Sequence, residues 1–175
     1  MPIKTIFLDR DGVINKEINY LHKIEDFEFI DGIFDSCLYL RNLGYEIIII
    51  TNQSGISRGY YSQNDYQKLT NWMLSQFNNH GISILDTFYC PHIPESMCSC
   101  RKPKPGMFLL ARDKHNIVMH QSWMIGDKET DITGANNAGI TNTIIVRTGH
   151  KINEKETKAK FVLDSINLSK SIIKV

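Results

Sequence analysis

The amino-acid sequence predicts an α/β fold, a doubly wound parallel sheet in a single domain spanning residues 1–175. Short apolar segments alternate with longer segments of helical period, as in strands joined by crossover helices. The segment Tyr-Glu-Ile-Ile-Ile-Ile at 45–50 is almost continuously apolar, which is typical of a parallel strand covered on both faces. A chain of 175 residues that is 42% hydrophobic can fill the core of one domain of this kind.

The chain begins with a strand, an irregular segment and a helix. Residues 3–8 form the predicted strand, and the charged and aromatic segment 13–31 is expected to be irregular or hairpin-like. Apolar residues recur with helical spacing from Ile33, and Gly44 is expected to end that helix. Cys37 lies on its apolar face, where a thiol behaves as a small buried hydrophobe.

A strand, a helix and a third strand follow. The second strand is 45–50. Ser62 and Asp65 then resemble a capping box, with Asp in place of the usual Glu, and predict a helix that ends near Gly81. Residues 84–89 form the third strand.

The second half continues the alternation. Pro105 is suited to the first turn of a helix that runs to about Asn116. Strands are predicted at 122–125 and 142–147, on either side of a short helix at 129–138. The sequence ends with a polar segment expected in solvent and two apolar pieces expected to pack back on the domain, at 151–160, 161–163 and 166–173.

Charge and hydropathy exclude several classes of function. The formal net charge of +1 provides no global field for nucleic acid or an anionic membrane. No apolar stretch approaches the ~20 residues of a membrane span, and no signal peptide precedes the first strand. We therefore expect a soluble, cytoplasmic, monomeric protein without nucleic-acid or membrane partners.

Two carboxylates end the first strand, at Asp9 and Asp11. Side chains two positions apart on a strand share a face, so both are expected to point into the crevice at the carboxyl end of the sheet. Their mutual repulsion favours a hard cation with oxygen ligands, such as Mg²⁺. The alternative is an ordinary β-turn, because Asp and Gly are turn residues.

Other polar groups stand where they can meet this pair, because parallel strands end at one edge of the sheet. They are Thr51-Asn52-Gln53-Ser54-Gly55, Arg101-Lys102-Pro103-Lys104-Pro105 and Gly126-Asp127-Lys128-Glu129-Thr130-Asp131. Carboxylates, a hydroxyl, amides and cations together suit phosphoryl transfer, which depends on positioning and charge stabilisation. Thr51-Asn52 could instead form a turn without function, and Asp131 could simply cap a helix.

In order and position these segments resemble the four motifs of the haloacid dehalogenase (HAD) superfamily. Cys90-Pro-His92 and Cys98-Ser-Cys100-Arg101-Lys102-Pro103 are similar, more narrowly, to heptose 1,7-bisphosphate 7-phosphatases and related histidinol-phosphate phosphatases. The resemblance covers residues 3–149 and implies a HAD-like sheet. No insertion is long enough for a separate cap domain, which needs ~50 residues.

The resemblance also implies roles for single residues. Asp9 is the expected nucleophile, Asp11 the general acid and then base, and Thr51 and Lys102 hold the transferring phosphoryl group. Mg²⁺ is expected on Asp9, the Asp11 carbonyl and Asp127, with Asp131 behind them to orient a metal-bound water or Lys102. The expected substrate-binding residues are Glu17, Ile18, Asn19, Tyr20, Asn52, Gln53, Ser54, Arg101 and Lys128. Lys104 is expected to be surface charge, and His115, His120 and His150 are interpreted as surface or loop histidines.

Four soft ligands lie within eleven positions: Cys90, His92, Cys98 and Cys100. Such a set suits a closed tetrahedral Zn²⁺ of structural role, although unrelated thiols in a loop are the alternative. Fixing this loop would preorganise Arg101, which directly follows the last ligand.

The resemblance thus implies a Mg²⁺-dependent sugar-bisphosphate phosphatase that forms an aspartyl-phosphate and serves nucleotide-activated heptose formation for lipopolysaccharide or capsule. A histidinol-phosphate phosphatase is the nearest alternative. A zinc-stabilised binding module without catalysis is a more distant one, and it is disfavoured because Asp9, Asp11 and Asp127 are all present.

Overall fold

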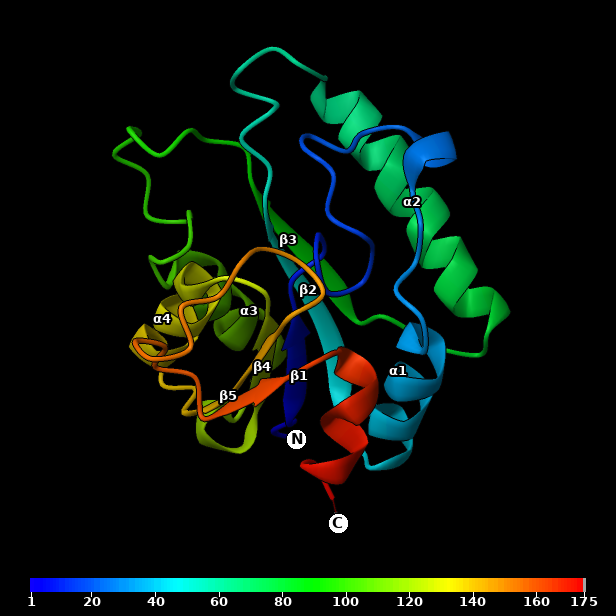
Figure 1. Ribbon diagram of the computed structural model, residues 1–175, viewed down its shortest axis with the longest axis vertical. Helices are drawn as coiled ribbons and strands as arrows, with labels where there is room; N and C mark the ends of the chain where they lie inside the picture. The colour runs from blue at the N-terminus through cyan, green and yellow to red at the C-terminus, as the bar shows by residue number, and fades with distance from the viewer. Residues whose placement is uncertain (175) are drawn as a thin grey trace.

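The computed structural model describes residues 1–174, and its centre is one six-stranded sheet (Figure 1). The strand order is β3-β2-β1-β4-β5-β6, and all neighbours are parallel. The strands are β1 Thr5–Leu8, β2 Glu46–Asn52, β3 Asp86–Cys90, β4 Trp123–Gly126, β5 Asn142–Val146 and β6 Phe161–Leu163. The predicted doubly wound parallel sheet is therefore confirmed.

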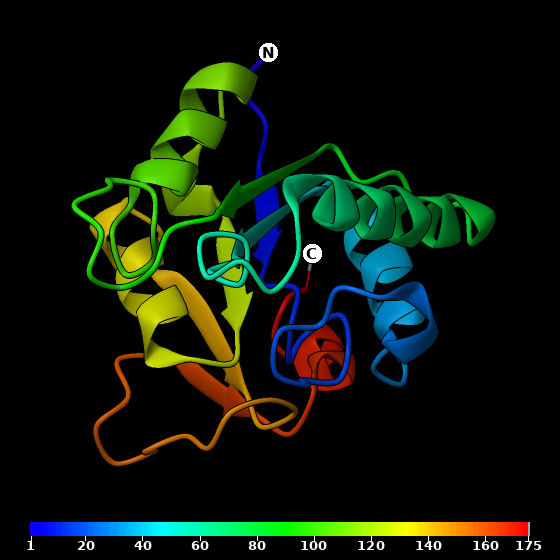
Figure 2. The same ribbon diagram turned by 90° about the horizontal axis from the view of Figure 1, so that it is seen from above.

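Helices cover both faces of the sheet. They are α1 Ile33–Asn42, α2 Gln63–Asn79, α3 Gly106–His115 and α4 Glu129–Asn137, with short 3-10 turns at Ile24–Asp26, Met119–Gln121 and Ile166–Ser171. Figure 2 shows α1 and α2 on one side of the sheet and α3 and α4 on the other. None of the helices described is long and apolar enough to cross a membrane.

Strand β2 explains why the sheet is buried on both faces. Ile47 and Ile49 pack in the core beneath α1 and α2, whereas Ile48 and Ile50 pack with α3 on the other side. All four are at most 1% exposed. A strand with alternate residues in two cores must be apolar throughout, which is the pattern that predicted it.

Several local predictions are confirmed and others shift. The capping box forms, since Ser62 Oγ accepts from Asp65 N at 3.1 Å and Asp65 Oδ2 accepts from Ser62 N at 2.9 Å. Cys37 is fully buried. Pro105 stands immediately before α3, at its N-cap, and not in the first turn. The 13–31 segment is hairpin-like, with an antiparallel bridge between Asn15 and Phe29.

The topology places polar residues together at one edge. The order of the strands reverses at β1, which has β2 on one side and β4 on the other. Asp9 follows β1 and Asp127 follows β4, so the two come from neighbouring strands at this switch point. Open α/β sheets bind ligands at such a point, outside the carboxyl ends of the strands.

Candidate active site

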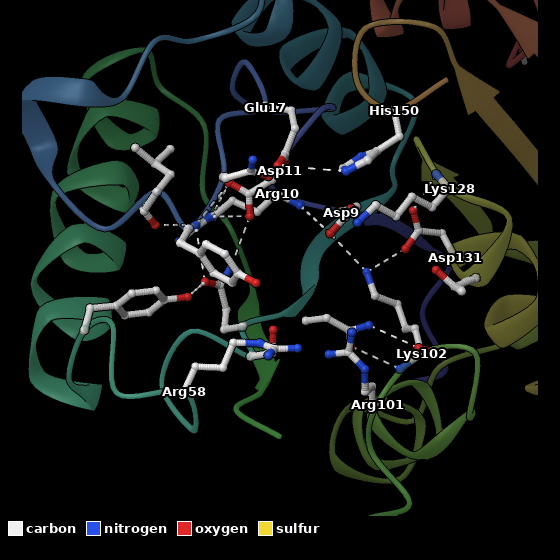
Figure 3. Close-up of a pocket in the computed structure, with 18 residues that line it drawn as sticks. Asp9, Arg10, Asp11, Glu17, Arg58, Arg101, Lys102, Lys128, Asp131 and His150 are labelled. Atoms are coloured by element: carbon white, nitrogen blue, oxygen red, sulfur yellow. Dashed lines mark hydrogen bonds and ion pairs between the residues drawn. The ribbon is translucent and has the colours of Figure 1, made fainter. Parts of the chain in front are cut away.

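A cavity of about 320 Å³ opens at the carboxyl edge of the sheet (Figure 3). Its lining residues are Asp9, Arg10, Asp11, Glu17, Asn19, Tyr20, Leu21, Asn52, Gln53, Ser54, Arg58, Tyr61, Arg101, Lys102, Lys128, Thr130, Asp131 and His150. Most of the predicted site residues are among them. Ile18 is outside this lining, with 43% of its surface exposed.

Asp9 lies at the floor of this cavity. Its Oδ1 accepts from Lys102 Nζ at 3.0 Å and from the Arg10 backbone N–H at 2.9 Å. Burial, and then the nearby charge of Asp131, raise the pKa of Asp9 well above its ordinary value, although Lys102 opposes this. The carboxylate therefore depends on neighbouring cations to stay charged.

Asp11 lines the same cavity, but other residues hold its carboxylate. Arg10 binds it with Nε and Nη2, at 3.2 and 3.1 Å. Asn15 Nδ2 donates to it at 3.0 Å and Gln53 Nε2 at 3.1 Å, while Gln53 is itself bound by Tyr61 Oη at 2.5 Å. Asp11 therefore has a different set of hydrogen-bond partners from Asp9.

Sequence reasoning missed three members of this network, Arg10, Asn15 and Tyr61. Arg10 is only 2% exposed and also donates to the Leu21 carbonyl at 3.0 Å. Its position between two aspartates was a usable signal, because a buried arginine needs carboxylate or carbonyl partners. Tyr61 contacts Gln53 within the loop between β2 and α2, and this contact leaves no recognisable sequence pattern.

Lys102 is the buried cation at the centre of the site. It is 2% exposed, and its Nζ lies 2.7 Å from Asp131 Oδ1 and 2.8 Å from the Ile50 carbonyl, in addition to Asp9. Burial alone would lower the pKa of Lys102, but Asp131 and Asp9 together raise it well above its ordinary range. Lys104, by contrast, is exposed, as expected.

Thr51 and Asn52 lie at the end of β2. Thr51 is 1% exposed beneath the cavity, and its Oγ1 accepts from Gln53 Nε2 at 2.8 Å. The Asn52 side chain lines the cavity and also binds the Lys102 backbone twice, donating to its carbonyl and accepting from its N–H, both at 3.1 Å. Asn52 therefore positions Lys102.

Three buried carboxylates, Asp9, Asp127 and Asp131, bring one oxygen each within 4.8 Å of one another. Both oxygens of Asp131 are used, since Oδ1 faces Lys102 and Oδ2 accepts from the N–H groups of Asp127 and Lys128 at 3.1 Å. Asp131 thus caps the first turn of α4 and also forms an ion pair with Lys102. Asp127 Oδ1, by contrast, is buried without a partner among the described residues, and burial, together with Asp131, raises the pKa of Asp127 to about 6.

Two of the three histidines have acidic partners that the sequence did not reveal. His115 Nε2 lies 2.7 Å from Asp86 Oδ2, and His150 Nδ1 lies 2.6 Å from Asp127 Oδ2. His150 also lines the cavity. These acidic partners are 29 and 23 positions away along the chain, so sequence neighbours could not reveal them. His120 is exposed and His150 lies in the loop after β5, as expected, whereas His115 is half-buried at the end of α3.

The cysteine cluster is assembled as predicted. Cys90, His92, Cys98 and Cys100 bring their ligand atoms within 4.8 Å of one another. Four of the six separations lie between 3.0 Å, for Cys100 and Cys90, and 3.8 Å, for Cys90 and Cys98. A tetrahedron with Zn–S bonds of ~2.3 Å has edges of ~3.8 Å, so this set could hold Zn²⁺.

Fold and site together define a phosphatase of the HAD-like hydrolase class, and the HAD-hydrolase-like family model matches residues 99–168. The chain is 49% identical, over 97% of both chains, to a D-glycero-alpha-D-manno-heptose-1,7-bisphosphate 7-phosphatase from Photorhabdus laumondii. It is 47% identical to a D-glycero-beta-D-manno-heptose-1,7-bisphosphate 7-phosphatase from Vibrio cholerae, over 95% of this chain and 94% of the relative. The chain belongs to this family of heptose-1,7-bisphosphate 7-phosphatases, which confirms the resemblance.

A solved structure agrees with this assignment. A D,D-heptose 1,7-bisphosphate phosphatase from B. bronchiseptica, crystallised with magnesium and phosphate, has a TM-score of 0.84 to this chain. The two share 26% sequence identity, with 94% of each chain covered.

Proposed function

We propose that this chain removes the C7 phosphate of D-glycero-D-manno-heptose 1,7-bisphosphate, leaving heptose 1-phosphate for nucleotide-activated heptose formation. The observation that carries the proposal is the floor of the cavity, where Asp9 and Lys102 lie 3.0 Å apart and two arginines of the lining, Arg58 and Arg101, form no ion pair within residues 1–174. The names of the relatives, which share 40–49% of their residues with this chain, support the substrate.

Catalysis by these residues follows the two-step route of a carboxylate nucleophile. Asp9 attacks phosphorus, the bond from phosphorus to the C7 oxygen breaks, and Asp11 gives that oxygen a proton. Asp11 then takes a proton from water, which attacks the aspartyl-phosphate and releases inorganic phosphate and Asp9. Lys102 stabilises the charge on the phosphoryl oxygens in both steps.

The carboxylate set fits Mg²⁺, the hard cation expected here. Asp127 Oδ1 is buried without a partner among residues 1–174, beside Asp9, whose pKa burial raises. We infer that Asp9, Asp127 and the Asp11 carbonyl hold Mg²⁺, because oxygen ligands of this kind suit it. When bound, the metal neutralises charge on the phosphoryl oxygens and on the carboxylates.

Two arginines suit the second phosphate of a bisphosphate. Arg58 and Arg101 come from different loops and line the same cavity, and Figure 3 shows both guanidinium groups at its lower rim. Within residues 1–174 neither forms an ion pair, whereas Arg10 and Lys102 are matched by carboxylates. Guanidinium groups bind phosphate in bidentate fashion, which suits both arginines to the second phosphate. Sequence reasoning chose Arg101 and missed Arg58.

The loop that carries Cys90, His92, Cys98 and Cys100 supports recognition of the second phosphate by Arg101. We propose that Zn²⁺ on the four clustered ligands leaves no open position and is therefore structural. The Arg101 backbone N–H donates to Cys98, and its Nη1 donates to the His92 carbonyl at 3.1 Å. Arg101 is thus hydrogen-bonded to two of the proposed ligand residues, His92 and Cys98.

Phosphate release from four compounds tests the proposal: both anomers of the heptose bisphosphate, histidinol phosphate and an aryl phosphate, each with Mg²⁺. We expect a heptose bisphosphate to give the highest kcat/KM, and Arg58→Ala and Arg101→Ala to lower it about tenfold or more, as loss of a charged hydrogen bond does. The aryl phosphate should be little affected, and Arg112→Ala on α3 is the matched control. Preference for histidinol phosphate, or equal losses on all substrates, would contradict the proposal.

A further inference from the structure

His150 is bound twice to one oxygen of Asp127. Its backbone N–H donates to Asp127 Oδ2 at 2.9 Å, and its Nδ1 lies 2.6 Å from the same atom. Asp127 accepts, so Nδ1 carries the proton. The pocket around this oxygen is tight, because a Cβ on Gly12 or on Gly149 would lie only 2.4 or 2.1 Å from it. Asp127 Oδ2 is therefore fixed by contacts from the loop that follows β5.

The other oxygen of Asp127 is left for a different partner. Oδ1 is buried and accepts nothing from residues 1–174. Two donors on Oδ2 disfavour bidentate coordination, so a cation beside Asp9 would bind Oδ1 alone. The orientation of the carboxylate thus depends on the imidazole ring.

The far side of the imidazole ring faces Glu17. His150 Nε2 lies 3.9 Å from Glu17 Oε1, and Figure 3 shows the ring facing Glu17 across the top of the cavity. The side chain of His150 is 37% exposed, so it is a bridge at the edge of the cavity and not a core residue. It joins the loop after β5 to the segment that follows β1.

We propose that His150 is a positioning residue, which aims Asp127 Oδ1 at the Mg²⁺ and so sets the affinity for the metal. This inference rests on the magnesium site of the proposed function. It is distinct from direct ligation, since Nδ1 is engaged by Asp127 Oδ2 and Nε2 faces Glu17. Partners of this kind typically change metal affinity 10–100-fold when removed.

Three substitutions separate the two ring nitrogens. His150→Asn keeps a donor near the position of Nδ1, His150→Gln keeps one near Nε2 only, and His150→Ala keeps neither. The readout is the dissociation constant for Mg²⁺ alone, measured by isothermal titration calorimetry on the full chain without substrate. We expect Ala and Gln to weaken binding about tenfold or more, and Asn to restore most of the loss. His120→Ala, an exposed histidine elsewhere, is the control and should match the unmodified protein.

Unchanged affinity in the Ala variant would overturn the inference, as would rescue by Gln and not by Asn. If the Ala variant fails to fold, the comparison of Asn with Gln still decides. Melting temperatures without metal show whether the loop after β5 has unfolded, because unfolding of that loop would lower the melting temperatures of all three variants equally. The proposed substrate is tested separately. If the Mg²⁺ affinities follow the expected order but the protein does not hydrolyse the heptose bisphosphate, the substrate is refuted and the role of His150 still holds.

Discussion

Replacing Lys102 by Met removes a buried cation and keeps an unbranched side chain. In the protein, Lys102 Nζ lies 3.0 Å from Asp9, 2.7 Å from Asp131 and 2.8 Å from the Ile50 carbonyl. The variant leaves two buried carboxylates and one buried carbonyl without this donor. We expect a large loss of both stability and turnover.

The magnitude follows from the burial of Lys102 and its partners. Removing one partner of a buried ion pair costs about 3–5 kcal/mol. For a protein of this size each kcal/mol lowers the melting temperature by about 2–4 °C, so we expect a fall of roughly 6–20 °C. Turnover should fall about 10²–10³-fold, as when one donor to a developing charge is lost.

The loss of stability should also depend on pH. Burial already raises the pKa of Asp9, and without Lys102 that pKa rises further. A carboxyl whose pKa is raised by folding binds its proton more tightly in the folded state, so stability falls as pH rises. The deficit of the variant should therefore be smaller at about pH 5 than at about pH 8.

Urea unfolding without Mg²⁺, at both pH values, measures this deficit. Lys104→Met is the matched control two residues away, where the lysine is exposed and the expected change is within about 0.5 kcal/mol. A Lys102→Met protein as stable as this control, or one with a deficit independent of pH, would refute the electrostatic account of the site.

Three further predictions concern the carboxylates. Asp9→Asn should abolish phosphate release and keep the circular dichroism spectrum; substantial residual turnover would contradict its role as nucleophile. Gly149→Ala places a Cβ 2.1 Å from Asp127 Oδ2, so Mg²⁺ affinity measured by calorimetry should fall, and unchanged binding would show that the loop moves freely. Folding raises the pKa of Asp127 to about 6, so the metal-free protein should lose stability as pH rises from about 4 to about 6. The melting temperature gained with Mg²⁺ should accordingly be larger at about pH 7 than at about pH 5, and a reversed order would count against that shift.

The sequence was sufficient for five of the six strands because its signals are local, whereas β6 was expected only as an apolar piece that packs back on the domain. Alternation of periods, the Ser62 capping box and the apolar run of β2 each depend on residues near one another in the chain. The same holds for residues at the strand ends, because parallel topology brings all of those ends to one edge. Asp9, Lys102 and Asp127 could therefore be assigned to one site before any coordinates were known.

Contacts between loops could not be predicted in this way. His150 contacts Asp127 across 23 positions, and Tyr61 is linked to Asp11 through Gln53. Such contacts depend on the path of the loops, which hydrophobic periodicity does not encode. Arg58 was missed for a related reason, since its loop follows β2 but its side chain is recognisable only by the absence of a partner among the described residues.

Arg101 and Lys102, the two cations next to the cysteine cluster, are held by different contacts, so removal of the proposed Zn²⁺ should affect them differently. Lys102 is fixed through Asn52 at the end of β2 and through Asp131, whereas Arg101 is attached to His92 and Cys98. Removal of Zn²⁺, with Mg²⁺ restored in excess before the assay, should therefore lower kcat/KM for the bisphosphate more than for an aryl phosphate, which needs Lys102 but not Arg101. Equal losses on both substrates would mean that zinc supports Lys102 as well, and that Asn52 cannot hold it unaided.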